Sequence, residues 1–415
     1  MKTEDSKILS GLKRLFNLDY VIVSVIILLI CYALSFVTYN VGALNPLKRV
    51  FEDFSMTDIY YHILHGRGAV ELSDDIVIVD MTKQTQRGEL ANTISLIGDC
   101  HPKVTVLDII FEYQTSDIKM DSFLVEAVNS LKTKVLASKL VNYNPNTQEF
   151  RQMRTSFFMD KDKYDWGYGN TTAGDQSNYI REYTTWQKCN GELVYSMPYL
   201  AACLYQGVKP KKEEVNFTQI MYNDKDFLVI PCDSVVENAK FIKDRIVYLG
   251  AMHEEADMHF SPIGKLAGVK IQAYATQTLL SHKSIRQMGT LASIIFTFFL
   301  CYFSALIVDY IRKRSTKADT ALSEHYPNMF PKDLQLERVK RIVSCYYLLL
   351  PIVLMFVSFL VFVFFGYNIQ LLLPLAGIAL TEMVKLTYKC FKPVFLNIKH
   401  WEIWKKLFKN KSEKA

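Results

Sequence analysis

The sequence predicts an α/β domain outside the cytoplasm, with an inserted antiparallel hairpin, carried by four transmembrane α-helices. Three observations lead to this fold class. Long apolar runs lie on both sides of residues 40–288, while that central region alternates short β-branched runs with stretches of helical periodicity. Within it, Asn190-Gly191 separates two β-rich runs, which is the pattern of a tight hairpin.

The apolar runs are long enough to be membrane spans. We expect transmembrane helices over the segments 20–39, 289–311, 342–365 and 369–388. A span needs roughly 20 apolar residues. The first run follows Lys7, Lys13 and Arg14 and exceeds the roughly 7–15 apolar residues of a cleaved signal peptide. We therefore interpret it as an uncleaved anchor, although Val41-Gly42-Ala43 resembles a cleavage site.

Basic residues near the ends of these runs predict the orientation. They precede the first span, fill the segment 312–341 between the second and third, and close the fourth at Lys385, Lys389 and Lys392. Because cytoplasmic flanks carry the excess of Lys and Arg, residues 1–19, 312–341 and 389–415 are predicted to be cytoplasmic. Residues 40–288 then face the periplasm or extracytoplasmic space of a multi-pass protein in a bacterial inner membrane.

The charge distribution argues against nucleic-acid binding. Residues 40–288 carry 27 Lys+Arg and 31 Asp+Glu, a balance of 27 − 31 = −4, and the rest of the chain carries 21 and 11, a balance of +10. The basic residues therefore flank apolar segments and are not gathered on one folded domain, as a nucleic-acid site would require. No cofactor is indicated by the sequence.

Elements of the outer domain follow from the same periodicities. A juxtamembrane helix is expected over 47–64. Buried strands are expected at 76–79, 103–108, 134–140, 227–230 and 246–249, and helices at 86–100, 116–131, 197–207 and 268–281. Residues 142–178 are polar and carry no predicted strand. The alternation of strand and helix indicates parallel β-α-β units.

Eight cysteines are spread irregularly along the chain. Four fall in the outer domain: Cys100, Cys189, Cys203 and Cys232. An even number in an oxidising compartment permits disulfides, but the wide spacing favours buried free thiols.

Several stretches of the outer domain resemble the second type of the CHASE domain, the cyclases/histidine-kinases-associated sensory extracellular domain. They are "MTDIYYHI", "IVIVDMT", "PKVTVLDIIF", "YGNTTAGDQSNYIREY", "CNGELVYSMPYLAACL", "RIVYLGA" and "DMHFSPIGKLAGVKIQAYATQTLLS". The order of one span, an outer domain and three further spans is also similar. The resemblance implies an extracytoplasmic sensory domain, and it does not imply an enzyme. Such proteins usually continue into a kinase or cyclase, whereas here residues 389–415 and 312–341 are both short.

Three aspartates are candidate ligand contacts. Asp80 and Asp108 follow predicted strands, and Asp257 lies beyond the strand 246–249. Ligands of open α/β sheets bind outside the carboxyl ends of the strands, so the three carboxylates are expected at one crevice if these strands are neighbours. Alternatively, they cap loops and helix N-termini by accepting backbone hydrogen bonds.

Metal binding and catalysis have weaker support. His253 and His259 flank Asp257 and are weak candidates for metal ligands, but no H-E-x-x-H spacing is present, and a solvated polar loop is the alternative. No nucleophile elbow or phosphate-binding glycine loop occurs. We expect the protein not to be an enzyme.

The C-terminal tail is predicted to be a basic amphipathic helix. Trp401, Trp404 and Phe408 lie near one face, with Lys405 beside them. This pattern favours a membrane surface or a docking partner. Glu382 and Lys385 of the fourth span are one turn apart and are interpreted as a pair near the interface, with Lys385 snorkelling.

Two functions remain open. The first is a receptor whose outer domain binds a ligand or partner and signals through its membrane helices to a separate cytoplasmic effector. The second is a non-enzymatic scaffold in a cell-envelope complex. Partners in either case are the membrane and a signalling or envelope protein, and the protein could also associate with itself.

Overall fold

The chain was analysed as a computed structural model. The structure describes residues 17–40, 58, 60, 61, 70–160, 165–170, 180–212, 217–222, 225–281, 286–325 and 332–397. It consists of two compact units: a mixed α/β domain formed by residues 52–286, and a helical unit formed by residues 1–51 and 287–415. Each unit is considered by itself below.

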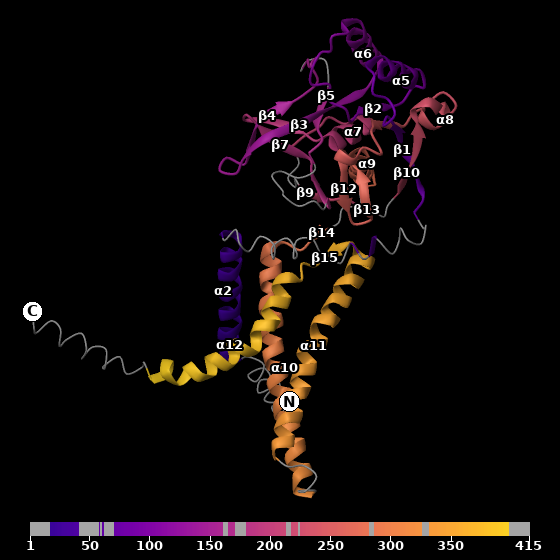
Figure 1. The fold of residues 1–415 in the computed structure, drawn as a ribbon. Coiled ribbons are helices and arrows are strands. Elements are labelled where there is room, and N and C mark those ends of the chain that lie inside the picture. The colour runs from indigo at the N-terminus through magenta and orange to yellow at the C-terminus, as the bar shows by residue number, and fades with distance from the viewer. Residues whose placement is uncertain are drawn as a thin grey trace, which may run out of the picture. The chain divides into compact units, whose positions relative to one another are not determined.

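A parallel sheet forms the centre of the α/β domain (Figure 1). Its strands, in spatial order, are β10 (Asp226–Pro231), β1 (Leu72–Asp80), β11 (Ile246–Gly250), β2 (Val104–Leu107), β3 (Lys134–Asn144) and β5 (Asp165–Tyr168). All neighbouring strands in this part run parallel. The four residues of β2 are all buried, as expected for a strand covered on both faces.

Helices cover both faces of this sheet. One face packs against α5 (Arg87–Asp99) and α6 (Ile118–Ser130), and the other against α7 (Met197–Gln206) and α9 (Gly268–Leu280). On β11, Val247 and Leu249 join the core beneath α5 and α6, whereas Tyr248 points the other way and bonds Thr276 of α9 at 2.5 Å. The alternation follows from the two-residue period of a strand. The helices predicted over 86–100, 116–131, 197–207 and 268–281 and the parallel strands are therefore confirmed.

A mixed extension, with one parallel and two antiparallel strand pairs, widens the sheet beyond β3. It consists of β4 (Glu149–Arg154), β7 (Trp186–Cys189) and β8 (Glu192–Tyr195). The β7–β8 pair is the predicted hairpin, and Asn190 and Gly191 have φ values of 51° and 79° at its turn. Strands β4 and β5 were not predicted, because their sequences are polar or aromatic and lack a continuous β-branched run.

Smaller elements complete the domain. They are β6 (Glu182–Thr184) paired with β9 (Phe217–Gln219), β12 (Met258–Ser261) paired with β13 (Gly264–Ala267), the 3₁₀ turns η2 (Cys232–Ser234) and η3 (Glu255–Asp257), and the short helix α8 (Ala239–Ile242). Cys100, Cys189, Cys203 and Cys232 are all free thiols.

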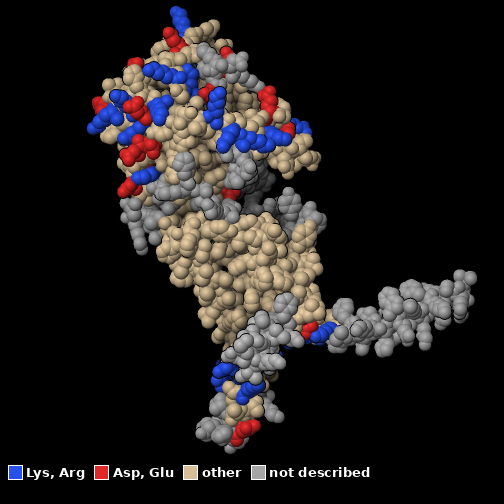
Figure 2. All heavy atoms as spheres, turned by 180° about the vertical axis from the view of Figure 1, so that it is seen from behind, with Lys and Arg blue, Asp and Glu red and all other residues tan. Residues whose placement is uncertain are grey.

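The helical unit contains α2 (Leu18–Asn40), α10 (Thr290–His325), α11 (Lys332–Phe365) and α12 (Leu372–Asn397). Within the described residues, only α10 and α11 are both long and apolar enough to cross a membrane, over Thr290–Ala321 and Gln335–Phe365. In Figure 2 the surface of this unit shows a broad area without charged side chains. The prediction of four spans is thus supported for two helices.

The other two predicted spans also form helices. Within the described residues, neither is both long and apolar enough to count as a candidate membrane span. In α2, the residues whose side chains the structure describes, Leu18–Leu34, form a shorter apolar helix. In α12, Glu382, Lys385 and Lys389 lower the hydropathy of the stretch that was expected to span. The short strands β14 (Arg286–Gln287) and β15 (Tyr367–Asn368) are also assigned, and the Met288 amide donates to the Asn368 carbonyl at 3.1 Å.

The segment 312–341 differs from the predicted loop. Helix α10 continues to His325 and α11 begins at Lys332, so most of this segment is helical and belongs to these two helices. Arg338 of α11 pairs with Asp319 of α10 at 3.1 Å, and Asp319 is 1% exposed. At 1.5 Å per residue, each helix exceeds the roughly 30 Å of a hydrocarbon core.

Charged and hydroxyl groups connect all four helices. Lys385 of α12 lies 2.5 Å from Asp309 of α10, and the hydroxyl of Tyr20 in α2 donates to the other oxygen of Asp309 at 2.5 Å. Glu382 pairs with Arg312 of α10 and accepts a hydrogen bond from the Tyr347 hydroxyl of α11. Lys385 is 1% exposed. The expected Glu382–Lys385 pair with a snorkelling lysine was wrong, since each residue pairs with α10.

Candidate ligand-binding cavity

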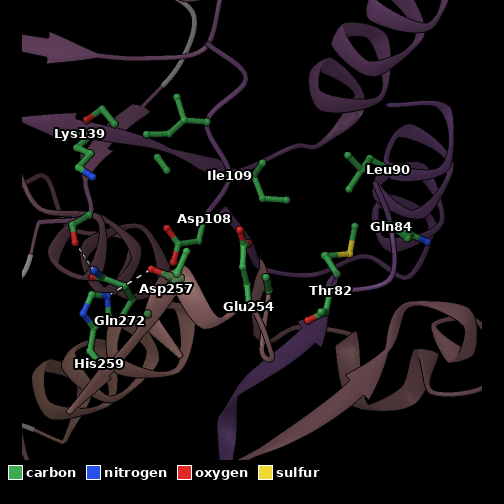
Figure 3. A pocket seen from close by; sticks show the side chains of 18 of the residues that line it. Thr82, Gln84, Leu90, Asp108, Ile109, Lys139, Glu254, Asp257, His259 and Gln272 are labelled. Carbon is green, nitrogen blue, oxygen red and sulfur yellow. Dashed lines mark hydrogen bonds and ion pairs between the residues drawn. The ribbon is translucent and has the colours of Figure 1, made fainter. Parts of the chain in front are cut away.

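A cavity of about 800 Å³ opens at the carboxyl ends of the parallel strands. It lies where sheet topology places ligands in open α/β folds, beyond the ends of β1, β11 and β2 and beside residues 137–139 in the middle of β3. Its wall is lined by Met81, Thr82, Gln84, Thr85, Leu90, Asp108, Ile109, Ile110, Ala137, Ser138, Lys139, Gly169, Asn170, Ala251, Glu254, Ala256, Asp257, His259, Gly268 and Gln272. Figure 3 shows Asp108, Asp257 and His259 on one side and Thr82, Gln84 and Leu90 on the other.

Asp108 directly follows β2. Its amide donates to the Leu249 carbonyl at 2.9 Å, which fixes the backbone against β11, and its half-buried side chain faces the cavity. Within the described part of the chain, the carboxylate has no hydrogen-bond partner. Burial, and then the charge of Asp257, raise the pKa of this carboxyl to about 7, while His259 opposes the shift. Asp108 is therefore poised between its acid and its carboxylate near neutral pH.

Asp257 lies beside the first residue of α9. A Cβ placed on Gly268 would come within 2.6 and 2.8 Å of the two Asp257 oxygens, so only glycine allows this approach. The Nε2 atom of His259 is 3.4 Å from Asp257 Oδ1. The N-terminal end of a helix favours negative charge, and the neighbouring His259 adds to that effect when protonated. The position thus holds a carboxylate at the cavity wall.

The remaining polar wall comes from β3, α9 and the end of β5. Gln272 of α9 is 5% exposed and donates to the Gly169 carbonyl at 2.6 Å. Asn170 exchanges hydrogen bonds with both backbone groups of Leu140, at 2.8 and 2.9 Å. Ser138 is 2% exposed, and its Oγ atom has no hydrogen-bond partner. Lys139 is exposed at the rim and forms no ion pair with any described residue.

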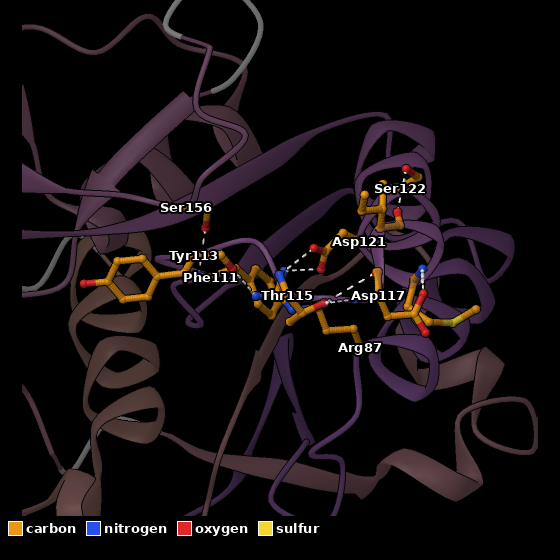
Figure 4. A network of polar contacts seen from close by, with 10 residues as sticks. Arg87, Phe111, Tyr113, Thr115, Asp117, Asp121, Ser122 and Ser156 are labelled. Atoms are coloured by element: carbon orange, nitrogen blue, oxygen red, sulfur yellow. Dashed lines mark hydrogen bonds and ion pairs between the residues drawn. The ribbon is translucent and has the colours of Figure 1, made fainter.

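A polar network holds the loop that follows Asp108 (Figure 4). Arg87 of α5 pairs with Asp121 of α6 at 2.7 Å, and the Thr115 amide donates to the same carboxylate at 2.7 Å. The Arg87 guanidinium also lies over the Phe111 ring, at 5.3 Å from its centre. The Phe111 amide donates to Ser156 Oγ at 3.0 Å. The loop is therefore anchored to two helices, which fixes the wall formed by Ile109 and Ile110.

Asp80 does not line the cavity. Its Oδ1 atom accepts hydrogen bonds from the Thr82 amide at 2.9 Å, the Thr82 hydroxyl at 2.5 Å and the Met252 amide at 3.2 Å. Although burial opposes the change, these hydrogen bonds and the nearby His253 lower the pKa of the Asp80 carboxyl. The aspartate joins the loops that follow β1 and β11, which corresponds to the capping alternative. The structure brings together Asp108 and Asp257 only.

The two candidate metal ligands are separated. His253 lies 3.8 Å from Asp80, whereas His259 pairs with Asp257. Among the described residues, no group of three or more His, Cys, Asp or Glu side chains is arranged to hold a metal ion. Trp401, Trp404, Phe408 and Lys405 lie outside the described residues, as does most of the predicted juxtamembrane helix 47–64.

Sequence reasoning missed several cavity residues. Gln272, Asn170 and Ser138 lie in a helix, a loop and a strand, and none belongs to a motif. The sequence held a partial signal for Ser138. This polar residue directly follows the apolar run Val135–Ala137 within the predicted strand 134–140. The others become recognisable only once the fold places α9 and β5 beside β2 and β3.

Residues 25–307, more than half of the chain, match the CHASE2 domain family. No curated protein and no solved structure matched the chain.

Proposed function

Because the chain belongs to the CHASE2 domain family, whose members are extracellular sensory domains, we propose that it is a membrane-anchored extracytoplasmic sensor. The outer domain binds a small molecule in the cavity at the strand ends. Binding is relayed through the membrane helices to a separate cytoplasmic effector. The observation that carries this proposal is a polar cavity of about 800 Å³ at the site where α/β sheets bind ligands.

Helix α9 is the element best suited to the relay. Its first turns contribute Gly268 and Gln272 to the cavity wall, and the nine residues 281–289 separate its end from the start of α10. A ligand that contacts the cavity wall differently in two states shifts their populations by its differential affinity. A displacement of α9 is thereby delivered to a membrane helix through a short connection.

We propose further that all four helices span the membrane, with both termini in the cytoplasm. The ion pairs of Asp309 and Arg312 with α12, and the hydrogen bond of Tyr20, favour placing α2 and α12 in one bundle with α10. Charged groups within a bundle are tolerated in a membrane when they face each other. Reporter fusions at residues 19, 265, 325 and 397 test this: only the fusion at 265 is expected to report an extracytoplasmic position.

The outer domain is proposed to be a binding module and not an enzyme. Among the described residues, no hydroxyl or thiol is hydrogen-bonded to His259, whose ring contacts Asp257 at 3.4 Å. Nucleophilic catalysis needs such a pair, because the base must take the proton of the nucleophile. The cavity side chains therefore support recognition more than chemistry.

A scaffold is the second candidate function, and one surface favours it. Apolar side chains are exposed on α6 and on the loop before it: Tyr113 is 75% exposed, Ile118 70% and Phe123 39%. Contiguous exposed apolar side chains mark sites of protein association. A scaffold would use this surface to hold an envelope protein, without a ligand-dependent change.

Co-purification from native membranes distinguishes the two functions. The full-length chain, its Asp257→Asn variant and a control variant, Glu237→Gln, would be captured and the bound proteins identified by mass spectrometry. Glu237 is exposed and does not line the cavity. A sensor recovers a cytoplasmic signalling protein whose yield or activity changes with Asp257→Asn only. Envelope proteins recovered equally with all three chains would instead establish the scaffold.

A further inference from the structure

The cavity wall carries more negative than positive charge. Three carboxylates line it, from Asp108, Glu254 and Asp257, against the amine of Lys139 and the imidazole of His259. We infer that the cavity binds a small organic cation whose ammonium or amidinium group lies between the Asp108 and Asp257 carboxylates. This inference rests on the proposed ligand-binding function and names the chemical class of the ligand.

The two carboxylates face the same space. Figure 3 shows the Asp108 and Asp257 side chains next to each other at the cavity wall. Neither is paired with a lysine or arginine among the described residues; Asp257 contacts only His259, at 3.4 Å. Like charges in a partly enclosed site raise each other's energy, and a cation between them removes that cost. Gly268 leaves room for the carboxylate of Asp257 at this position, since a Cβ there would displace it.

A second feature of the wall is independent of these charges. Ser138 is 2% exposed and lines the cavity, yet its Oγ atom has no hydrogen-bond partner. A buried hydroxyl without a partner costs free energy, and a ligand group can supply the missing hydrogen bond. The cavity therefore offers a hydrogen-bonding position in addition to the acidic pair, as a polar organic ligand requires.

The size and composition of the cavity favour an organic cation over a metal ion. Its volume of about 800 Å³ is that of a small-molecule site and far exceeds one ion. No group of three metal-ligating side chains occurs among the described residues. Apolar side chains of Met81, Leu90 and Ile109 also line the wall and fit the carbon skeleton of an amine.

Binding of such a cation is linked to pH through Asp108. The groups facing this carboxyl are Asp257, His259 and the Tyr248 hydroxyl, and Glu254 and Lys139 line the same cavity. The pKa of Asp108 is about 7, so a cation binds best after its proton has left. Affinity for an amine is therefore expected to rise about tenfold between pH 6 and pH 8, as one proton is released.

Thermal unfolding of the full-length protein in detergent micelles tests the inference. The probes are putrescine and agmatine as cations, glucose as a neutral polyol and succinate as an anion. A ligand that binds only the folded state raises the unfolding midpoint with its concentration. The variants are Asp108→Asn, Asp257→Asn and the control Glu237→Gln, each measured at both pH values.

The expected result is stabilisation by at least one of the two amines, stronger at the higher pH, retained by Glu237→Gln and lost in Asp257→Asn. In Asp108→Asn the residual effect should no longer depend on the Asp108 proton, so the pH difference shrinks. Stabilisation by glucose or succinate without any by the amines would overturn the ligand class and leave the sensor function intact. No stabilisation by either amine at millimolar concentration would also overturn it, whereas the co-purification experiment judges the sensor function separately.

Discussion

Two aspartates at strand ends of the same parallel sheet have opposite electrostatic surroundings. Asp80 accepts three hydrogen bonds, whereas the Asp108 carboxylate has no hydrogen-bond partner among the described residues and lies near Asp257. The pKa of Asp80 is accordingly lowered, and that of Asp108 is raised to about 7. One residue contributes to the stability of the fold, and the other reduces stability at a position suited to binding.

Replacing Asp108 by asparagine is expected to stabilise the protein at alkaline pH. Because its folded-state pKa lies above the ordinary value, the protonated carboxyl favours the folded state below about pH 4, and this contribution is lost as the pH rises through about 7. At pH 8, Asp108→Asn should raise the free energy of unfolding by roughly 1 to 3 kcal/mol. This is less than the full pKa shift of Asp108 implies, because the side chain is only half-buried. Unfolding midpoints of the two proteins from pH 4 to 8 measure it. A difference that stays constant across this range would contradict the assignment.

Replacing Asp80 by alanine is expected to have the opposite pH profile. The lowered pKa means that its contribution is present above the ordinary value and is lost as the pH falls through the lower folded-state value. At pH 7 the variant leaves the Thr82 amide and hydroxyl without their acceptor and removes one of the two acceptors of the Met252 amide, which costs about 1 to 3 kcal/mol. The same measurements of the unfolding midpoint should show that the loss of stability in Asp80→Ala becomes smaller towards acid pH. Equal loss at every pH would mean that the carboxylate charge has no part in it.

Sequence alone identified both aspartates as strand-end carboxylates but did not separate their roles. The distinction depends on side chains and amides from another part of the chain. Asp80 meets the Met252 amide, 172 residues away, whereas Asp108 lies beside Asp257 at the cavity wall. These long-range contacts follow from the order of strands in the sheet, which local periodicity does not encode.

At the scale of elements, the sequence predicted what local patterns determine. The buried runs of β1, β2, β3, β10 and β11 are confirmed, as are α5, α6, α7 and α9. Asn190-Gly191 also marked its hairpin, because both turn residues need positive φ. Strands β4 and β5 were not predicted. Strand β5 is the short sequence Asp-Trp-Gly-Tyr, which becomes a strand by pairing with β3. Such pairing is a tertiary effect that overrides intrinsic propensity.

The hairpin turn provides a test of backbone strain. Gly191 has a φ of 79°, and nothing lies within 4 Å of a Cβ added there, so Gly191→Ala changes conformational preference alone. We expect a loss of about 1 to 2 kcal/mol in unfolding free energy. Gly289 is equally open and has no positive φ, so Gly289→Ala serves as the control and should change little. Chemical denaturation of the two variants compares them, and similar midpoints would argue against the strained turn.

At the scale of the whole molecule, the hydropathy of the sequence predicted where the helices of the helical unit lie in the chain. It did not predict how their charged side chains pair. The short spacing of Glu382 and Lys385 suggested a pair within α12. Instead, each side chain reaches α10, because a buried charge in a helical bundle is best compensated by a partner on the facing helix. Lys385 also donates to the Ala305 carbonyl at 3.2 Å. The bundle contacts therefore depend on which helices are neighbours, as the cavity does.

Breaking the Asp309–Lys385 pair is expected to destabilise the helical unit strongly. Asp309→Asn leaves Lys385, 1% exposed, without its carboxylate at 2.5 Å. Removing one partner of a buried pair costs about 3 to 5 kcal/mol, whereas replacing both by uncharged side chains costs much less. The double variant Asp309→Asn, Lys385→Met should therefore recover most of the loss.

The matched control is Glu337→Gln on α11. Its partner Arg341 lies at 3.1 Å, and both side chains are exposed, so this substitution should cost about 0 to 1 kcal/mol. Unfolding of the full-length protein in detergent measures all three. If Asp309→Asn were as mild as Glu337→Gln, the pair would not hold the bundle, and the placement of α12 against α10 would lose its support.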